Sequence, residues 1–220
     1  MSRMSGSFLS ESFLPPAPAG GRPRTTQMRD VVDAIFYILR TGRTRRLAGA
    51  SCQWRYLPKD FPPKSTVWRY FKQWQQDGTL ERIHDALRTK VRAAEKPYSP
   101  RTTASVDSQS VDTTSGGEQR GRDNAKNVDG RKRHIVIDSM GLLLAVLVTA
   151  ANVDDARAAQ TLFSRLDGQP TSKIRRMYAD GKYHNFSLYE WVEENADWNL
   201  SIVRRPPGQK GWITLLLRYS

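Results

Sequence analysis

The sequence is poor in several residue types, and each shortage excludes a class of protein. Cys52 is the only cysteine among 220 residues, so neither a disulfide scaffold nor a cysteine-rich zinc site can form. The longest apolar run, residues 141–151, is shorter than the roughly 20 residues that a membrane-spanning helix needs. The first 20 residues lack the apolar centre of a signal peptide. We therefore expect a cytoplasmic protein without a membrane span.

Acidic residues are also scarce, because 22 Asp and Glu face 35 Lys and Arg and leave a formal charge of +13. Residues 21–100 carry most of the excess, with seventeen basic and seven acidic side chains, whereas residues 101–220 have an excess of only +3. Such a charge attracts a polyanion, most simply nucleic acid. The alternative is that surface Lys and Arg only keep the chain soluble. We favour a basic binding module followed by a domain that uses carboxylates.

The first half of the chain has helical periodicity. Residues 1–24 are rich in Ser, Pro and Gly, which predicts a flexible lead-in. Apolar residues at helical spacing then predict a helix over residues 26–41. A second helix is expected between a cap at Ser65 and a stop at Gly78, and a third helix begins at a cap on Thr79.

Short helices, tight glycine turns and basic flanks are typical of a helix-turn-helix-like bundle. We assign a small helical DNA-binding domain to residues 25–96, with prolines forming a linker into residues 97–220. The basic residues around the second helix are candidates for phosphate contacts, although plain solvation is the alternative. These residues are Lys64, Arg69 and Lys72.

The second half changes to strand periodicity with interspersed helices. Strands are expected over residues 102–108, 133–138, 142–149, 173–179 and 198–203. Helices are expected over residues 154–166 and 185–195. Three successive strands followed by alternating helices and strands predict a mixed α/β sheet.

Two carboxylates in this half are candidates for chemistry. Asp107 lies in the first expected strand, and Asp180 follows a later one. Either residue alone is more often a turn residue or a helix cap. If their strands are neighbours, however, the two carboxylates repel each other unless a cation lies between them, and oxygen ligands suit Mg²⁺. Such ions promote phosphodiester chemistry, and Gly181 would let the backbone turn sharply beside a nucleic-acid strand.

A second basic cluster opens the expected strand near these acids. Arg131, Lys132 and Arg133 are candidates for phosphate contact, and the alternative is a solvated strand end. His134 follows them, and a lone histidine in a strand is more often a packing residue than a ligand.

Many short motifs, in a fixed order, carry a resemblance to a known family. In the first half they are Leu14-Pro-Pro, Gly21-Arg-Pro-Arg-Thr, Cys52-Gln-Trp-Arg-Tyr-Leu-Pro and Ser65-Thr-Val-Trp. In the second half they are Val106-Asp-Ser-Gln-Ser, Gly130-Arg-Lys-Arg-His-Ile-Val-Ile-Asp, Thr149-Ala-Ala-Asn-Val-Asp-Asp, Ala179-Asp-Gly-Lys-Tyr and Ile202-Val-Arg-Arg-Pro. From about Leu14 to Lys210 the chain resembles the DDE transposases of short bacterial insertion sequences.

The resemblance implies an RNase H-like catalytic domain behind a helical DNA-binding region. In such enzymes two Asp and one Glu hold Mg²⁺ or Mn²⁺, and Asp107 and Asp180 match the first and second of these acids. The reaction nicks the end of the element, and the freed 3′-hydroxyl then attacks target DNA. The implied partners are double-stranded DNA, at element ends and target, and further copies of the chain. The implied location is the bacterial nucleoid.

Two departures from the family pattern matter. The likeness fades after Gly211, before the expected Arg-rich strand and the helix that bears the Glu, so the resemblance implies a truncated sheet without the third acid. The glutamates on the helix after Asp180 do not occupy the matching place; they are Glu190, Glu193 and Glu194. In the first half, the segment 43–51 is an insertion with three arginines.

Three functional hypotheses follow. The first is a transposase that binds insertion-sequence ends and performs metal-dependent cleavage and strand transfer, in a copy that lacks the third acid. The second is a catalytically inactive DNA-binding protein that regulates the intact transposase. The third is a frameshifted product whose second frame supplies the Glu, which the nucleotide sequence beyond Ser220 would decide.

Overall fold

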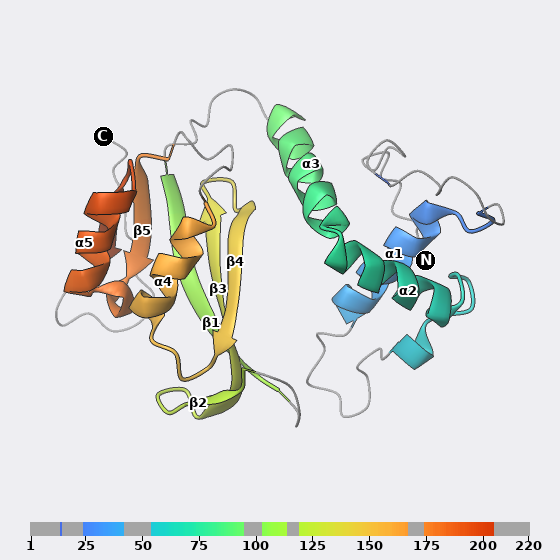
Figure 1. Ribbon diagram of the computed structural model, residues 1–220, viewed down its shortest axis with the longest axis horizontal. Coiled ribbons are helices and arrows are strands. Elements are labelled where there is room, and N and C mark those ends of the chain that lie inside the picture. Colours follow the sequence, from blue (N-terminus) through green and yellow to red (C-terminus); the bar gives the residue numbers. More distant parts are fainter. Residues whose placement is uncertain are drawn as a thin grey trace. The chain divides into compact units, whose positions relative to one another are not determined.

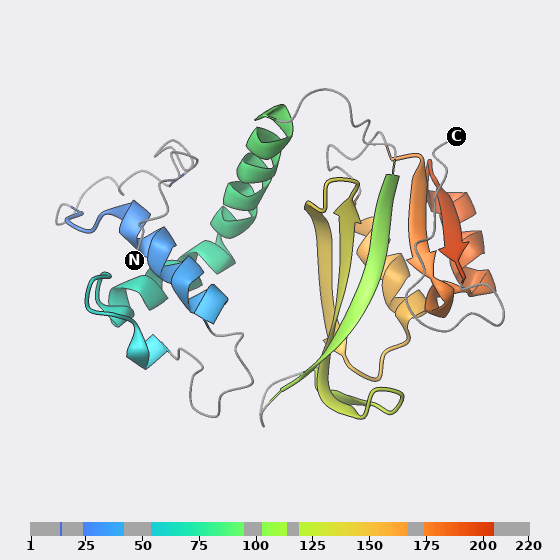
Figure 2. The same cartoon turned by 180° about the vertical axis from the view of Figure 1, so that it is seen from behind.

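The computed structural model describes residues 14, 24–41, 54–94, 103–113, 119–166 and 174–204. Several expectations lie outside these residues: most of the 1–24 lead-in, the 43–51 insertion, Cys52, the proline linker and everything after Arg204. The chain divides into two compact units, residues 1–96 and 97–220. Figures 1 and 2 show both units from opposite sides, and each unit is described by itself.

The first unit is helical. It contains α1 (Met28–Thr41), the short 3-10 helix η2 (Trp54–Tyr56), α2 (Lys64–Gln76) and α3 (Thr79–Ala94). Its core is a cluster of apolar side chains from α1 and α2, with Val31 and Val67 both 0% exposed and Trp74 1% exposed. The helical region expected from the spacing of apolar residues is therefore confirmed.

The helix ends differ in detail from the expectation. Ser65 does not cap α2, because the cap position is Pro63, two residues earlier, and the helix begins at Lys64. The proline ring already holds the backbone in a conformation compatible with a first turn. Between α2 and α3, Gly78 has a φ of 72°, a left-handed conformation that favours glycine. The Asp77 carboxylate accepts a hydrogen bond from the Thr79 amide at 3.0 Å. The pKa of Asp77 is lowered, first by a hydrogen bond from the Thr79 side chain and further by this amide bond.

The described residues of the second unit form a six-stranded mixed sheet with two α-helices. Its elements are β1 (Thr103–Asp112), β2 (Gly121–Asp123), β3 (Val128–Asp138), β4 (Leu143–Ala150), α4 (Asp155–Ser164), β5 (Arg176–Asp180), η3 (Gly181–Tyr183), α5 (Phe186–Asn195) and β6 (Asn199–Val203). The strand order is β2-β3-β1-β5-β6, with β4 paired to β3. β1 runs antiparallel to β3 and parallel to β5, and β5 runs parallel to β6. The expected mixed α/β sheet is confirmed.

The two faces of this sheet differ. α4 and α5 lie over one face, where apolar side chains of the strands and helices form the core (Figure 1). Figure 2 shows the other face, which none of the described helices of this unit covers. We call it the open face. Because strand side chains alternate, every second residue of β1, β3 and β5 reaches the open face.

The strand boundaries were the least accurate part of the sequence interpretation. β3 begins at Val128 rather than at Arg133, and the three-residue β2 was not expected at all. Glycine, arginine and aspartate dominate this hairpin, so it has no apolar alternation to recognise. Among the described residues, no helix is long and apolar enough to cross a membrane.

Candidate active site

The two sequence-predicted acids occupy matching positions on neighbouring strands. β1 and β5 are paired in parallel, and the last paired residues are Ser105 and Tyr178. Asp107 and Asp180 each lie two residues beyond that pair, and both are exposed. Residues at matching positions of parallel strands share one face, and neighbouring strands lie about 4.8 Å apart. Two carboxylates from distant parts of the sequence are thus brought to the open face.

Local backbone contacts hold each acid in place. The Oδ1 atom of Asp107 accepts a hydrogen bond from the Ser108 amide at 2.7 Å. The Oδ1 atom of Asp180 accepts one from the Lys182 amide at 3.1 Å and so caps η3. Because both bonds use Oδ1, each acid can present Oδ2 to a ligand.

Gly181 does not adopt the left-handed conformation that only glycine favours, although it leaves open space beside Asp180. The left-handed glycines among the described residues are Gly78 and Gly141, so no sharp glycine turn follows Asp180. Instead the chain continues directly into η3. A Cβ atom placed on Gly181 would meet nothing within 4 Å, so the space beside Asp180 is open.

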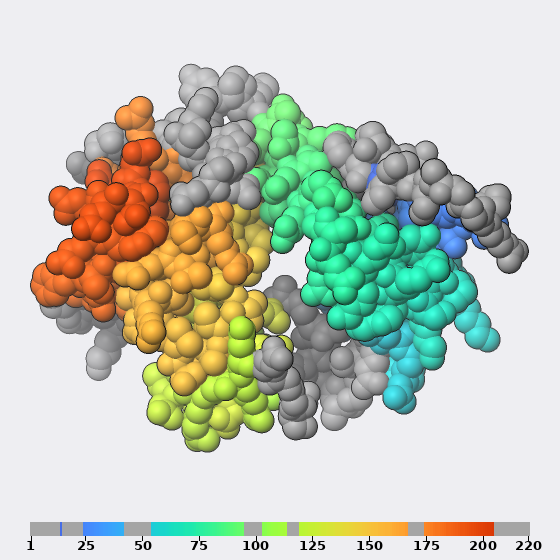
Figure 3. Space-filling model, in the orientation of Figure 1, coloured from blue at the N-terminus to red at the C-terminus, as the bar shows by residue number. Residues whose placement is uncertain are grey.

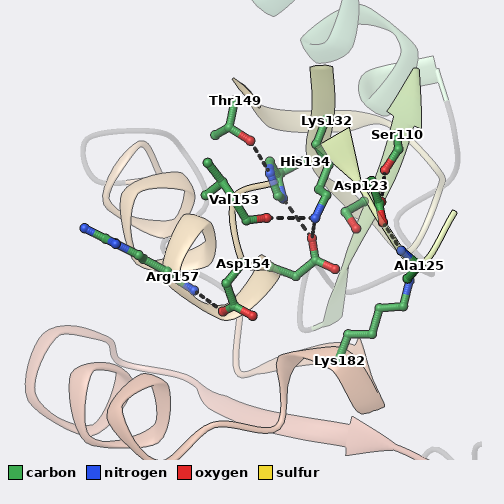
Figure 4. Close-up of polar contacts among 12 residues, drawn as sticks. Ser110, Asp123, Ala125, Lys132, His134, Thr149, Val153, Asp154, Arg157 and Lys182 are labelled. Carbon is green, nitrogen blue, oxygen red and sulfur yellow. Dashed lines mark hydrogen bonds and ion pairs between the residues drawn. The ribbon is translucent and has the colours of Figure 1, made fainter. Parts of the chain in front are cut away.

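A buried polar cluster lies on the helix-covered side of β3. Lys132 Nζ lies 3.1 Å from Asp155 Oδ1 and donates a hydrogen bond to the Val153 carbonyl at 2.7 Å. His134 Nε2 lies 3.0 Å from Thr149 Oγ1. Figure 4 shows Lys132 pointing toward Val153 and His134 toward Thr149. The cluster connects β3, β4 and the beginning of α4, which fixes the strand next to the one that bears Asp107.

This cluster corrects the expectation for Lys132. Its side chain is only 9% exposed and is neutralised by Asp155, so it cannot contact a phosphate. Strand alternation explains the error, because three successive basic residues cannot share one face. Arg131 and Arg133 reach the open face, whereas Lys132 points into the core. The packing position expected for His134, which is 0% exposed, is confirmed.

Burial changes the titration of two groups near the cluster. Burial lowers the pKa of His134, and the neighbouring carboxylate of Asp155 only partly offsets this effect. Burial also raises the pKa of the Tyr183 hydroxyl, and the negative charge of Asp155 adds to the rise. Both side chains are therefore neutral at pH 7.

Comparison with known proteins decides the family. Residues 98–211, just over half of the chain, match the family model described as "Transposase DDE domain". The chain belongs to the DDE transposase family. Its residues 9–84 match a second model, for transposases of the IS4/5 family. The DDE domain is RNase H-like, which agrees with the mixed sheet of the second unit.

Two individual proteins are similar to this DDE transposase. The first is the "Insertion element IS402 uncharacterized 16.2 kDa protein" of Burkholderia cepacia, 31% identical over 121 residues, which cover 52% of this chain and 74% of that protein. The second is the piggyBac transposase in a synaptic complex with hairpin DNA, with 15% identity and a TM-score of 0.43. That match covers 90% of this chain, which spans 46% of the length of the piggyBac chain.

The basic candidates of the transposase lie in both units. In the sheet unit, Arg133 pairs with Gln109, two residues along β1 from Asp107, so the arginine and the acid share the open face. In the helical unit, Lys64, Arg69 and Lys72 are all exposed on α2. Lys72 Nζ lies 5.1 Å above the Trp68 ring, and the Arg69 guanidinium lies 5.2 Å above Tyr70.

The sequence interpretation missed Asp155 and Tyr183. Asp155 follows the helix cap Asp154 and has the sequence signature of an ordinary first turn. One signal was available: a lysine at a core-facing position of a strand needs a buried counter-ion, and an acid at the start of the next helix can supply it. Tyr183 is 1% exposed and lies in η3 immediately after Asp180.

Proposed function

We propose that this DDE transposase binds the ends of an insertion sequence and that Asp107 and Asp180 hold a divalent cation for phosphodiester cleavage and strand transfer. The observation that carries the proposal is the matching position of the two acids on β1 and β5, both exposed on the open face. Residues 97–220 are the catalytic domain and residues 25–96 the DNA-binding domain in this proposal. Its site of action is the nucleoid in the bacterial cytoplasm.

The donor set fits Mg²⁺ or Mn²⁺. Mg²⁺ in phosphoryl-transfer sites is bound by one or two carboxylates together with substrate phosphates and waters, and it needs no complete cage of protein ligands. Two neighbouring carboxylates at a solvent-exposed position offer that arrangement. When bound, divalent ions stabilise charge on the phosphate and make a water or hydroxyl a better nucleophile.

The chain itself positions the DNA. In the first step an oxygen of water attacks the phosphorus atom at the element's end, the P–O3′ bond breaks, and the strand is left with a free 3′-hydroxyl. In the second step that hydroxyl attacks a target phosphodiester, and the target's own 3′-oxygen leaves. Arg131 and Arg133 neutralise phosphates on the open face beside the acids. Further copies of the chain on the same DNA would hold the two ends together.

DNA cleavage also depends on the Glu that completes the acid triad of DDE transposases. Among the described residues, no group of three or more His, Cys, Asp or Glu lies in a metal-binding arrangement. Glu190, Glu193 and Glu194 lie on α5, over the opposite face of the sheet from Asp107 and Asp180. This arrangement favours a second candidate function, a DNA-binding protein that occupies element ends and regulates an intact transposase without cleaving them.

A cleavage assay separates the two candidates. The full chain is incubated with labelled duplexes that carry the element's terminal inverted repeats, with and without Mg²⁺. Cleavage that Asp107→Asn abolishes and that Asp197→Asn retains would establish the enzyme, because Asp197 is an exposed acid away from the pair. Specific binding without cleavage would establish the regulatory function. A chain that neither binds nor cleaves these duplexes would refute both candidate functions.

A further inference from the structure

Helix α2 differs in charge from α1 and α3, the other α-helices in the described part of its unit. It carries Lys64, Arg69 and Lys72 and contains no Asp or Glu. By contrast α1 carries Asp30 and Asp33, and α3 carries Glu81 and Asp85. Among the described α-helices of this unit, α2 alone can therefore lie along a polyanion without repulsion from an acid of its own.

The outward side of α2 is one polar stripe. Val67 and Trp74 are 0% and 1% exposed and fix the side that faces the core. At 100° per residue, the side directly opposite carries four residues, which are separated along the sequence by four, three and four positions. All four are exposed; they are Ser65, Arg69, Lys72 and Gln76. With a rise of 1.5 Å per residue the stripe is about 16 Å long.

None of the described residues of the helical unit covers the stripe, since its four side chains are all exposed. In Figure 3 the blue-green side chains of α2 lie on the face of this unit that is turned toward the viewer. A helix of ordinary diameter fits the major groove of B-DNA, which is about 12 Å wide. The stripe also has the side chains that distinguish base edges: arginine and lysine bind guanine, glutamine binds adenine, and serine binds either.

We propose that α2 is the recognition helix of this protein and enters the major groove of duplex DNA, with Ser65, Arg69, Lys72 and Gln76 facing the bases. The inference deepens the proposed function, on which it rests, by naming the side chains that select the sequence. Arg69 and Lys72 are thereby base-reading residues, whereas Lys64, in the first turn of the helix and about 100° around it from the stripe, contacts a phosphate.

The full chain provides a test with a matched control on the same helix. A pool of duplex DNA with a random central sequence is selected on the wild-type chain, and the affinities of the winning sequence and its single-base variants are measured at several salt concentrations. Gln76→Ala is compared with Gln75→Ala, because Gln75 is exposed but lies about 100° away from the stripe. Arg69→Ala is compared with Arg40→Ala on α1.

Gln76→Ala and Arg69→Ala are each expected to lose discrimination at one base position, by roughly 10-fold or more. Gln75→Ala and Arg40→Ala keep the wild-type preference. Lys64→Ala weakens all sequences equally and reduces the salt slope by about one. Gln76→Arg gives a gain-of-function readout, because the preferred base at its position changes to guanine.

Two results would overturn the inference in distinguishable ways. A wild-type chain that selects no sequence would refute both the end-binding function and the recognition helix. A wild-type preference that survives both Gln76→Ala and Arg69→Ala, or that Gln75→Ala abolishes equally, would refute the recognition helix alone. Circular dichroism of each variant checks that α2 remains folded.

Discussion

Lys132 Nζ lies 3.1 Å from Asp155 Oδ1, and both side chains are more than nine-tenths buried. This ion pair joins the centre of β3 to the first residue of α4. β3 is the antiparallel neighbour of β1, which carries Asp107. The pair therefore stabilises the part of the sheet from which the candidate active site is built.

Removing Lys132 is expected to destabilise the sheet strongly. Lys132→Ala leaves the Asp155 carboxylate buried without a counter-ion, which costs about 3–5 kcal/mol of unfolding free energy. Arg133→Ala, one residue further along β3 and exposed, changes it by about 0.5 kcal/mol or less. Urea unfolding, followed by amide exchange of the sheet residues, measures both values. Equal effects of the two substitutions would contradict a structural role for the pair.

Stability is expected to fall in mildly acidic solution because of His134. Burial lowers the pKa of this side chain in the folded state, whereas in the unfolded chain it titrates near its ordinary value of about 6.5. Below pH 6.5 the unfolded state therefore binds the proton more readily, and folding free energy is lost as the pH falls. Urea midpoints at pH 7.5 and 5.5 measure this loss. His134→Gln reduces this loss of stability, whereas His184→Gln, at an exposed position, does not. Equal losses in the two variants would show that another group is responsible.

Substitution by alanine is expected to affect stability differently at two glycines of the sheet unit. A Cβ atom on Gly130 would collide with the backbone carbonyl of Val111 on the paired strand. Gly130→Ala therefore forces β3 and β1 apart and lowers the melting temperature, with a cost of about 1–3 kcal/mol. Gly181→Ala meets open space and is tolerated. A melting temperature for Gly130→Ala equal to that of Gly181→Ala would contradict the close strand approach.

Basic residues on the open face are expected to affect DNA affinity on only one side of Asp107 and Asp180. Arg133 is paired with Gln109, which follows Asp107 along β1. Arg176 lies on the same face but at the opposite end of β5 from Asp180. Arg133→Ala reduces affinity for duplex DNA and lowers the salt slope by about one, and Arg176→Ala leaves both unchanged. Fluorescence anisotropy between 50 and about 200 mM salt covers the useful range. Loss of affinity in both variants alike would indicate a diffuse field instead of a defined DNA path.

Local periodicity predicted most of the fold. The helices and the strands with clear apolar alternation, such as Leu143–Ala150, follow from the residues alone. β2 and the first half of β3 could not be predicted, because their residues are mostly polar and the pairing of β3 with β1 depends on the whole sheet. Strand order was likewise inaccessible to local patterns, although it alone brings positions 107 and 180 together.

The candidate site was predictable in its residues but not in its surroundings. Asp107 and Asp180 stand out by their positions in or after strands, and the resemblance to DDE transposases assigns them. The face to which each basic residue points required the strand register, which places Lys132 in the core and Arg133 on the open face. Asp155 looks like an ordinary first-turn acid, and only a lysine at a core-facing position of a strand, Lys132, indicates that it is buried.

Metal binding tests the central claim most directly. Mn²⁺ is titrated into the full chain in the presence of a DNA duplex, and the free ion is followed by electron paramagnetic resonance. The account predicts that Asp107→Asn and Asp180→Asn each weaken Mn²⁺ binding by about 10-fold or more, whereas Asp197→Asn leaves it unchanged. Mn²⁺ binding that is the same in the wild type and in both Asp107→Asn and Asp180→Asn would contradict it.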